Sequence, residues 1–318
     1  MVFLLQKTLV YAAPLLIVAL AGMFAERSGV INLALEGEMI FGAFIGAIFA
    51  QFFTGIEYFT NHIQVMFLLV LLISGVSSAV FSLLLSLSAV TLKADQTIGG
   101  TALNMLAPAI VNAFALSIFN SEKIQMPSNF AGYVIKNENL PAFVQIFGDK
   151  AYLSTYVIVI MFVVLSVWIY KTRTGMRMRS CGEHPQAAAS VGINVFKMRY
   201  LGTTISGFLA GIGGYAYIAT IADGTAESSV GGMGFLALAI MIFGNWKPLG
   251  IALGAILFGF LKCIGPVSSS IGFLERLGLP MYFYNIIPYF VVLVVLAITA
   301  KKSGVPKAEG IPYDKGMR

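Results

Sequence analysis

Residues 64–92 read QVMFLLVLLISGVSSAVFSLLLSLSAVTL, a stretch without a charged residue that consists almost entirely of apolar residues, serine and glycine. A helix needs about 20 predominantly apolar residues to cross the roughly 30 Å hydrocarbon core of a bilayer. This stretch is long enough to cross, and it is one of several. The other long uncharged runs are 8–25, 39–56, 96–121, 151–170, 200–222, 228–246 and 277–300. The sequence therefore predicts an all-α polytopic membrane protein.

The overall composition agrees with this prediction. Hydrophobic residues make up 58% of the chain and charged residues 11%, whereas about a quarter of a soluble domain is charged. This excludes an ordinary soluble enzyme, a coiled coil and a disordered chain. We expect a single transmembrane domain over residues 1–318 with about nine spanning helices. The predicted spans are 8–25, 33–53, 64–92, 97–119, 151–170, 200–221, 230–246, 249–266 and 283–300.

The charges between these spans predict their orientation. Loop 171–199 and tail 301–318 are strongly basic, whereas loop 120–150 is balanced and turn 223–227 carries only acids. Because basic loops stay on the cytoplasmic side, the first two are predicted to be cytoplasmic and the other two extracytoplasmic. An odd number of spans then places the N-terminus outside and the C-terminus in the cytoplasm.

Glycine is abundant, with 33 residues, and several glycines predict how helices pack. Pairs spaced four apart put two glycines on one helix face, where helices approach closely in lipid. We interpret these pairs as packing seams within one subunit rather than as a dimer face. They are Gly42 and Gly46, Gly207 and Gly211, and Gly250 and Gly254. Run 58–92 is too long for one perpendicular helix, so we expect a tilt or a break near Gly75.

Polar residues inside apolar segments are costly and are therefore candidates for function. The segment ERSGVINLALEGE, residues 26–38, interrupts an apolar region with three carboxylates. We interpret Glu26 and Arg27 as a surface pair at a cytoplasmic turn. For Glu36, a salt bridge or helix-start cap and a role in transport both remain open. Asn32 is a weaker candidate for the substrate pathway.

A second polar cluster begins at Asp95. Gln96, Gly100 and Asn104 recur every four residues, so one helical face carries two amides around a glycine gap. Such amides either bind a polar solute in the pathway or bond a neighbouring helix. Phe235 is a further pathway candidate, because an aromatic ring can stack on a planar solute, although core packing is the alternative.

Loop 171–199 is longer than a helix connection requires, and it contains a predicted short surface helix. Pro185 fixes the helix start and Gly192 its end. Alanines between them leave a thin surface that can enter a cleft on a partner, although a plain connector is the alternative. We expect Ala188→Glu to block docking without unfolding the protein, because the loop lies outside the bilayer.

Sequence signatures of enzymes are missing. No phosphate-binding G-x-x-x-x-G-K-[S/T] loop and no G-x-S-x-G or H-E-x-x-H motif occurs. The two cysteines and two histidines lie far apart and show no metal-ligand spacing. We therefore expect neither a metal nor a cofactor in this chain, and no catalytic residues.

Four stretches together resemble the membrane permease subunits of ABC-type importers for simple sugars and nucleosides, and look closest to the nucleoside-uptake branch. They are ERSGVINLALEG (26–37), GEHPQAAASVGIN (182–194), FGNWKPLG (243–250) and PKAEGIPYDK (306–315). Glu38 departs from the pattern of that branch, where an apolar residue is usual, and its role is unassigned.

The resemblance implies a type II (BtuC-like) permease bundle in a bacterial cell membrane. This chain would pair with a second permease, a paralogue, to form the pathway. A cytoplasmic ATPase would use ATP and Mg²⁺, and an extracytoplasmic substrate-binding lipoprotein would deliver a nucleoside. The predicted loop helix would couple permease and ATPase through Gly182, Glu183, Pro185, Ala187, Ala188 and Gly192.

Two alternatives remain at this point. One is a simple-sugar permease of the same type, because no residue pattern distinguishes sugar from nucleoside. The other is a secondary transporter driven by an ion gradient, with Glu36 and Glu38 as the titrating pair. Only the second alternative requires transport without an ATPase.

Overall fold

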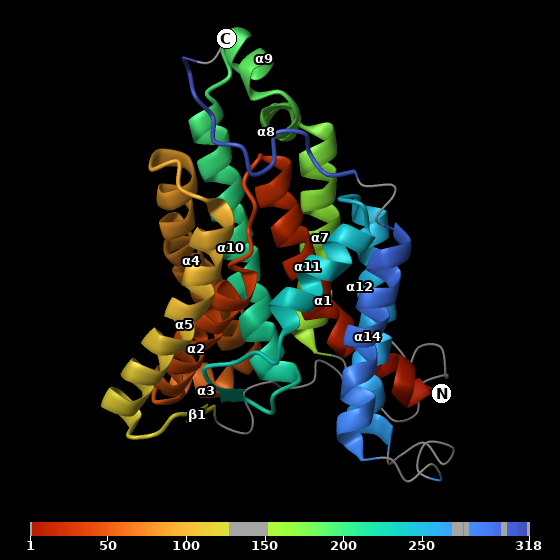
Figure 1. Ribbon diagram of the computed structural model, residues 1–318. Helices are drawn as coiled ribbons and strands as arrows, with labels where there is room; N and C mark the ends of the chain where they lie inside the picture. Colours follow the sequence, from red (N-terminus) through yellow and green to blue (C-terminus); the bar gives the residue numbers. More distant parts are fainter. Residues whose placement is uncertain (1, 127–151, 269–275, 277–279, 300–303, 317–318) are drawn as a thin grey trace.

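The computed structural model describes residues 2–126, 152–268, 276, 280–299 and 304–316, so most of loop 120–150 lies outside the described residues. Nearly all described elements are helices (Figure 1). They are α1 (Val2–Arg27), α2 (Leu35–Thr54), α3 (Glu57–Asn61), α4 (Ile63–Ser86), the π-helix η1 (Leu87–Thr91), α5 (Gln96–Phe119), α7 (Leu153–Lys171), α8 (Arg173–Glu183), α9 (Pro185–Ser190), α10 (Val195–Thr220), α11 (Met233–Phe243), α12 (Pro248–Val267) and α14 (Met281–Thr299).

Six of the described helices are long and apolar enough to cross a membrane: α1, α2, α4 with η1, α5, α7 and α12. Helices α11 and α14 are apolar but shorter over their described parts. Each predicted span coincides with a helix of the structure. The polytopic helical architecture is thus confirmed, whereas the number of nine crossings stays a prediction.

The predicted break at Gly75 is wrong. Helix α4 runs unbroken through Gly75, and the long apolar run is interrupted instead at His62 and at η1. Gly75 has another role, because a Cβ there would lie 2.8 Å from the ring of Phe208 on α10. The missing side chain therefore allows two helices to approach and does not weaken the helix.

Helix α10 lies at the centre of the bundle against α1, α2 and α4. A Cβ on Gly42 would lie 2.5 Å from Gly211 Cα, and one on Gly46 would lie 2.5 Å from the Tyr215 ring. The interpretation of these glycines as seams within one subunit is confirmed. Along the facing side of α4, four buried serines recur every four residues; they are Ser74, Ser78, Ser82 and Ser86.

The serine hydroxyls bond across these seams. Ser74 donates to the carbonyl oxygens of Gly42 (2.6 Å) and Gly211 (2.9 Å), and Ser78 donates to that of Glu38 (2.9 Å). Because neighbouring helices in lipid gain little from apolar burial, close packing and interhelical hydrogen bonds hold them together.

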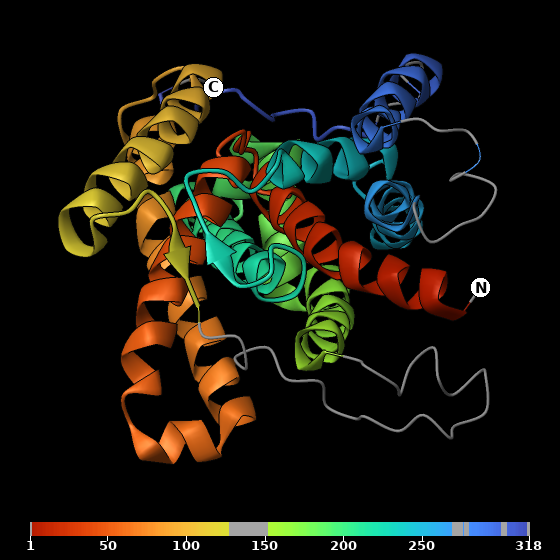
Figure 2. The same ribbon diagram turned by 90° about the horizontal axis from the view of Figure 1, so that it is seen from below.

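Helices α8 and α9 lie at one end of the bundle, whereas α3 and the N-terminus lie at the other (Figure 1). At the N-terminal end, strands β1 (Ile124–Gln125) and β2 (Thr225–Ala226) form an antiparallel pair, which Figure 2 shows from below. Beside it, Lys123 and Glu227 form an ion pair of 2.7 Å. The two segments predicted to be extracytoplasmic therefore meet at the end opposite to the basic loop.

Candidate functional site

The stretch between α1 and α2, residues 28–34, is a non-helical loop inside the bundle, hereafter the buried loop. Ser28, Val30 and Asn32 are completely buried. Non-helical backbone at membrane depth is tolerated only where protein or a water-filled cavity satisfies its polar groups. The groups that bond this backbone therefore define the site.

The two amides of α5 hold the buried loop. The Ile31 amide donates to Gln96 Oε1 (2.8 Å), and Asn104 Nδ2 donates to the Leu33 carbonyl (2.6 Å). Asn104 Oδ1 also accepts from the Gly37 amide (2.7 Å), at the start of α2. The amide face predicted on α5 is thus real, and it bonds both the buried loop and the first turn of a neighbouring helix, α2.

Glu36 caps a helix that begins almost two hundred residues later in the chain. Its Oε1 accepts from the Gly232 amide (2.9 Å) and its Oε2 from the Gly234 amide (2.7 Å). These amides lie at the start of α11, where the helix dipole favours a negative charge. Of the two interpretations left open for Glu36, the cap is therefore present, although on α11 and not on its own helix.

Glu38 joins the buried loop to the helices. Both carboxylate oxygens accept from Asn32 Nδ2, at 3.0 and 3.2 Å, and the same nitrogen donates to Ser206 Oγ on α10 (2.8 Å). Glu38 is 0% exposed. The carboxylate that the sequence left without a role thus fixes Asn32 between α2 and α10.

The five predicted pathway residues converge on one place: the buried loop and the starts of α2 and α11. Glu36 and Asn104 have their polar contacts within this cluster, whereas Asn32 also donates to Ser206 on α10. Gln96 is buried, and its Nε2 has no partner among the described residues. Phe235, in the first turn of α11, is 50% exposed and is not core.

Near the start of the buried loop, at the α8–α9 end of the bundle, the predicted surface helix exists as α9. Pro185 occupies its first turn, and Gly192 has a φ of +82°, which ends the helix in a conformation that favours glycine. The preceding α8 is capped by Thr172 Oγ1, which accepts from the Gly175 amide (3.2 Å). Local signals in the sequence therefore determined both ends of α9.

The face of α9 that Ala188 occupies was predicted wrongly. Ala188 is only 3% exposed and packs against Cys181, Val195 and Tyr313. The exposed residues are Gln186, Ala187, Ser190 and Val191. Three consecutive alanines carry no contrast in polarity, so no local signal indicates which of them points inward. Ala188→Glu would consequently disturb the packing of α9 itself.

Residues next to α9 attach it to α1. Gly182 packs so closely on the Arg27 carbonyl that a Cβ would clash there. Arg27 pairs with Glu183 (3.4 Å) and donates to the Trp246 carbonyl (3.0 Å). The predicted surface pair of Glu26 and Arg27 is wrong, because Glu26 is buried and accepts instead from Trp246 Nε1.

The tail, expected only to be cytoplasmic, is a non-helical segment with a turn at 307–310; its described part, residues 304–316, is hereafter the C-terminal strap. It crosses the α8–α9 end of the bundle (Figure 1). Its Glu309 hydrogen-bonds Glu26, and burial raises the pKa of Glu309 to about 7. Pro306, Pro312 and the aromatic Tyr313 are the signals that could have indicated an ordered strap.

These features define a polytopic integral-membrane protein: a helical bundle that contains a buried loop at the starts of two internal helices. A family model described as branched-chain amino acid transport system / permease component matches residues 4–296. The chain belongs to this family.

Individual relatives are similar along almost their whole length. The guanosine ABC transporter permease protein NupQ of Bacillus subtilis is 37% identical over 99% of this chain and 97% of its own. The nucleoside ABC transporter permease protein NupC of Lactococcus lactis is 34% identical over 98% of this chain and 96% of its own. NupB of the same organism, also a nucleoside ABC transporter permease protein, is 23% identical over 98% and 85%. No solved structure matches the chain significantly.

Proposed function

We propose that this chain is a permease subunit of an ATP-driven importer that moves nucleosides into the cell by alternating access. The observation that carries the proposal is its similarity, at more than a third of positions and over nearly the whole length, to permeases named for guanosine and nucleoside transport. The chain itself supplies a pathway and a mechanical link, and ATP hydrolysis takes place in a separate cytoplasmic subunit.

A second permease subunit, a paralogue of this one, completes the pathway. Lactococcus lactis has two nucleoside permeases that both resemble this chain, which supports a heterodimer. On this chain, α5 carries exposed threonines at positions 97 and 101 on a spanning helix whose exposed face is mostly apolar. Hydroxyl groups on an exposed face suit a pathway or a partner subunit better than lipid. We therefore place α5 at the junction of the two permeases.

The cluster around the buried loop is the proposed substrate contact. The ring of Phe235 is exposed beside it and can stack on a nucleobase. Gln96 Nε2 is a buried donor without a described partner, and such groups normally find one. A base or ribose acceptor would satisfy it. The same cluster begins α2 and α11, so movement of either helix would change the contact.

The α8–α9 end is the proposed cytoplasmic side. The exposed face of α9, with Gln186 and Ala187, is proposed to enter a cleft on the ATPase. This orientation puts the C-terminal strap in the cytoplasm and the N-terminus outside, with nine crossings of type II (BtuC-like) arrangement. The β1–β2 end then faces an extracytoplasmic substrate-binding lipoprotein.

A gradient-driven mechanism receives no support from the two carboxylates that it requires. Glu36 is engaged by two backbone amides at a helix start, and Glu38 by Asn32. Both have a structural function in this arrangement, so a proton or ion cycle is not needed to explain why they are buried.

Uptake of labelled guanosine into cells that express the complete transporter and lack other nucleoside uptake tests the proposal. We expect uptake that excess unlabelled nucleoside abolishes and excess glucose or ribose leaves unchanged. Competition by the sugar alone would show a sugar permease. Uptake that continues when the ATPase is omitted would show a gradient-driven transporter.

A further inference from the structure

The C-terminal strap connects parts of the cytoplasmic end that are far apart in sequence. The Ala308 amide donates to the Gly182 carbonyl (2.8 Å) beside α9. Arg199, buried at the start of α10, donates to the Ile311 carbonyl (2.8 Å). Asp314 pairs with Lys93 (2.9 Å) in the connection from η1 to α5. The strap is therefore held at its centre and at its end by independent contacts.

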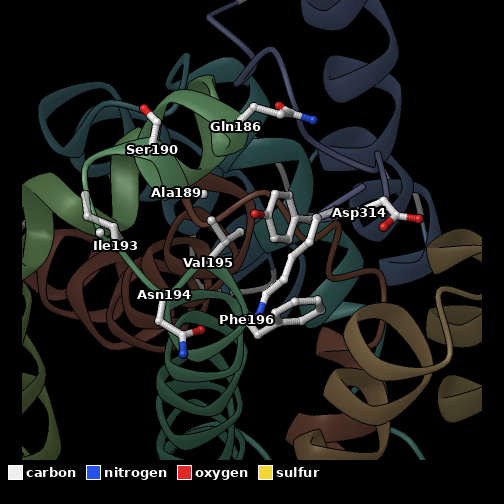
Figure 3. A pocket seen from close by; sticks show the side chains of 11 residues that line it. Gln186, Ala189, Ser190, Ile193, Asn194, Val195, Phe196 and Asp314 are labelled. Carbon is white, nitrogen blue, oxygen red and sulfur yellow. The ribbon is translucent and has the colours of Figure 1, made fainter. Parts of the chain in front are cut away.

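The end of the strap encloses a hollow together with α9 and the first turn of α10. Its volume is ≈ 480 Å³. In Figure 3, Gln186 and Ser190 of α9 lie on one side of it and Asp314 of the strap on another. The rings of Phe196 and Tyr313 contact each other edge to face at 5.3 Å between centroids and form an apolar wall.

The charge of the hollow favours an acidic occupant. Of its two charged lining residues, Asp314 is already paired with Lys93. Lys315 has no ion-pair partner among the described residues, and its ammonium lies 5.8 Å from the centre of the Phe196 ring. Lys197, which is exposed and directly follows the lining residue Phe196, has the same sign. A carboxylate brought to this place would meet an unneutralised positive charge.

The position of the hollow favours a protein over a membrane surface. In Figure 1, α9 and the first turns of α10 project beyond the ends of the other helices at this side of the bundle. Lipid headgroups adjoin the ends of the spanning helices, whereas the hollow lies further out. It is also continuous with the exposed face of α9, because Gln186 and Ser190 belong to both.

We propose, on the basis of the function proposed above, that the C-terminal strap and the exposed face of α9 together form the binding site for the ATPase. The hollow between α9, the start of α10 and Tyr313–Lys315 receives a segment of the ATPase that carries a carboxylate for Lys315. The strap also contacts Lys93, which lies just before α5. A movement of the ATPase at this binding site would therefore be transmitted to α5, whose amides hold the buried loop.

Co-purification of the ATPase with the complete transporter tests this proposal. Lys315→Glu should weaken ATPase binding about tenfold, since it replaces an attraction by a repulsion. Lys307→Glu is the matched control, because it reverses an exposed charge on the same strap outside the hollow, and it should have little effect. Ser190→Trp should fill the hollow and abolish co-purification. Retention of both permeases in the membrane fraction confirms that each variant is folded.

Normal ATPase binding by both Lys315→Glu and Ser190→Trp would overturn the proposal. In that case Ala187→Glu, on the exposed face of α9, tests separately whether α9 contacts the ATPase, as the proposed function requires. Loss of binding in Ala187→Glu alone leaves α9 as the ATPase contact and removes the strap from it. Equal losses with Lys315→Glu and Lys307→Glu would show a general charge effect. Loss of binding to phosphatidylglycerol vesicles with intact ATPase binding would show a lipid site.

Discussion

The buried loop and the C-terminal strap are both non-helical segments of the same helical bundle. The loop lies inside the bundle and the strap crosses its α8–α9 end, and different contacts hold them in place. The buried loop is fixed by side-chain amides that bond its backbone deep in the protein. The strap is fixed by buried Arg199, which donates to its Ile311 carbonyl, and by an exposed ion pair, a small apolar cluster and a partly buried acid. Non-helical backbone inside a membrane cannot replace its hydrogen bonds by bonds to water, whereas backbone at the membrane surface can. The first region is therefore suited to constant geometry and the second to reversible contact.

The largest effect is expected when the hydrogen bonds that hold the buried loop are removed. Asn104→Ala removes the partners of the Gly37 amide and the Leu33 carbonyl, and each stranded group costs about 1–3 kcal/mol. We expect low amounts of folded protein and loss of uptake, measured by thermal stability in detergent and by transport. Ser77→Ala on α4 is the control, because its hydroxyl bonds only its own helix. Full stability and uptake in Asn104→Ala would show that α5 does not hold the buried loop.

The second-largest effect is expected at the C-terminal strap and α9, without a change at the buried loop. Ala188→Glu places a carboxylate in the cluster of Cys181, Val195 and Tyr313, where an unpaired charge is strongly unfavourable. We expect displacement of α9 and loss of uptake, while the spanning bundle keeps its stability. Limited proteolysis should cleave near residue 188 in this variant and not in Ala187→Glu. Identical proteolysis of the two variants would contradict the inward orientation of Ala188.

A smaller effect is expected where the region around the buried loop joins α11. Glu36→Ala strands the Gly232 and Gly234 amides and removes a favourable charge at a helix start, for about 1–2 kcal/mol. Glu36→Gln keeps one acceptor and should restore much of this stability. Equal melting temperatures for the alanine variant and the unchanged protein would show that the cap contributes nothing.

The smallest effect concerns pH and only the strap. Burial raises the pKa of Glu309 from 4.5 to about 7, next to Glu26 and Arg27. An acid with a raised pKa stabilises the docked strap fully below pH 4.5, and this contribution disappears as the pH rises through 7. Hydrogen-exchange protection of the Ala308 amide should fall between pH 5 and 8, after correction for intrinsic exchange. Glu309→Gln should remove this dependence, and an unchanged pH profile in that variant would exclude Glu309 as its source.

Local chemistry allowed part of this molecule to be predicted. Long apolar runs located the helices, and Pro185 with Gly192 bounded α9. The four-residue repeat of Gln96, Gly100 and Asn104 correctly put two amides on one face. These signals act within a few turns of one helix, so the sequence displays them directly.

The partners of these residues could not be predicted, because they come from distant parts of the chain. Glu36 reaches α11, and Trp246 rather than Arg27 meets Glu26. A glycine among serines, such as Gly75, is typical of a helix break. Here its missing side chain instead allows the close approach of Phe208. The orientation of Ala188 depends on Tyr313 in the strap. Such pairings follow from the packing of the whole bundle and have no local signature.

The central claim is that ATP hydrolysis, transmitted at the cytoplasmic end, drives nucleoside movement past the buried loop. The most direct measurement records ATP hydrolysis and guanosine accumulation together in proteoliposomes containing both permeases and the ATPase. We predict that both require the nucleoside-loaded binding protein, that Ala187→Glu abolishes both, and that collapse of ion gradients changes neither. Guanosine accumulation without the ATPase, or its loss on collapse of a gradient while hydrolysis continues, would contradict the claim.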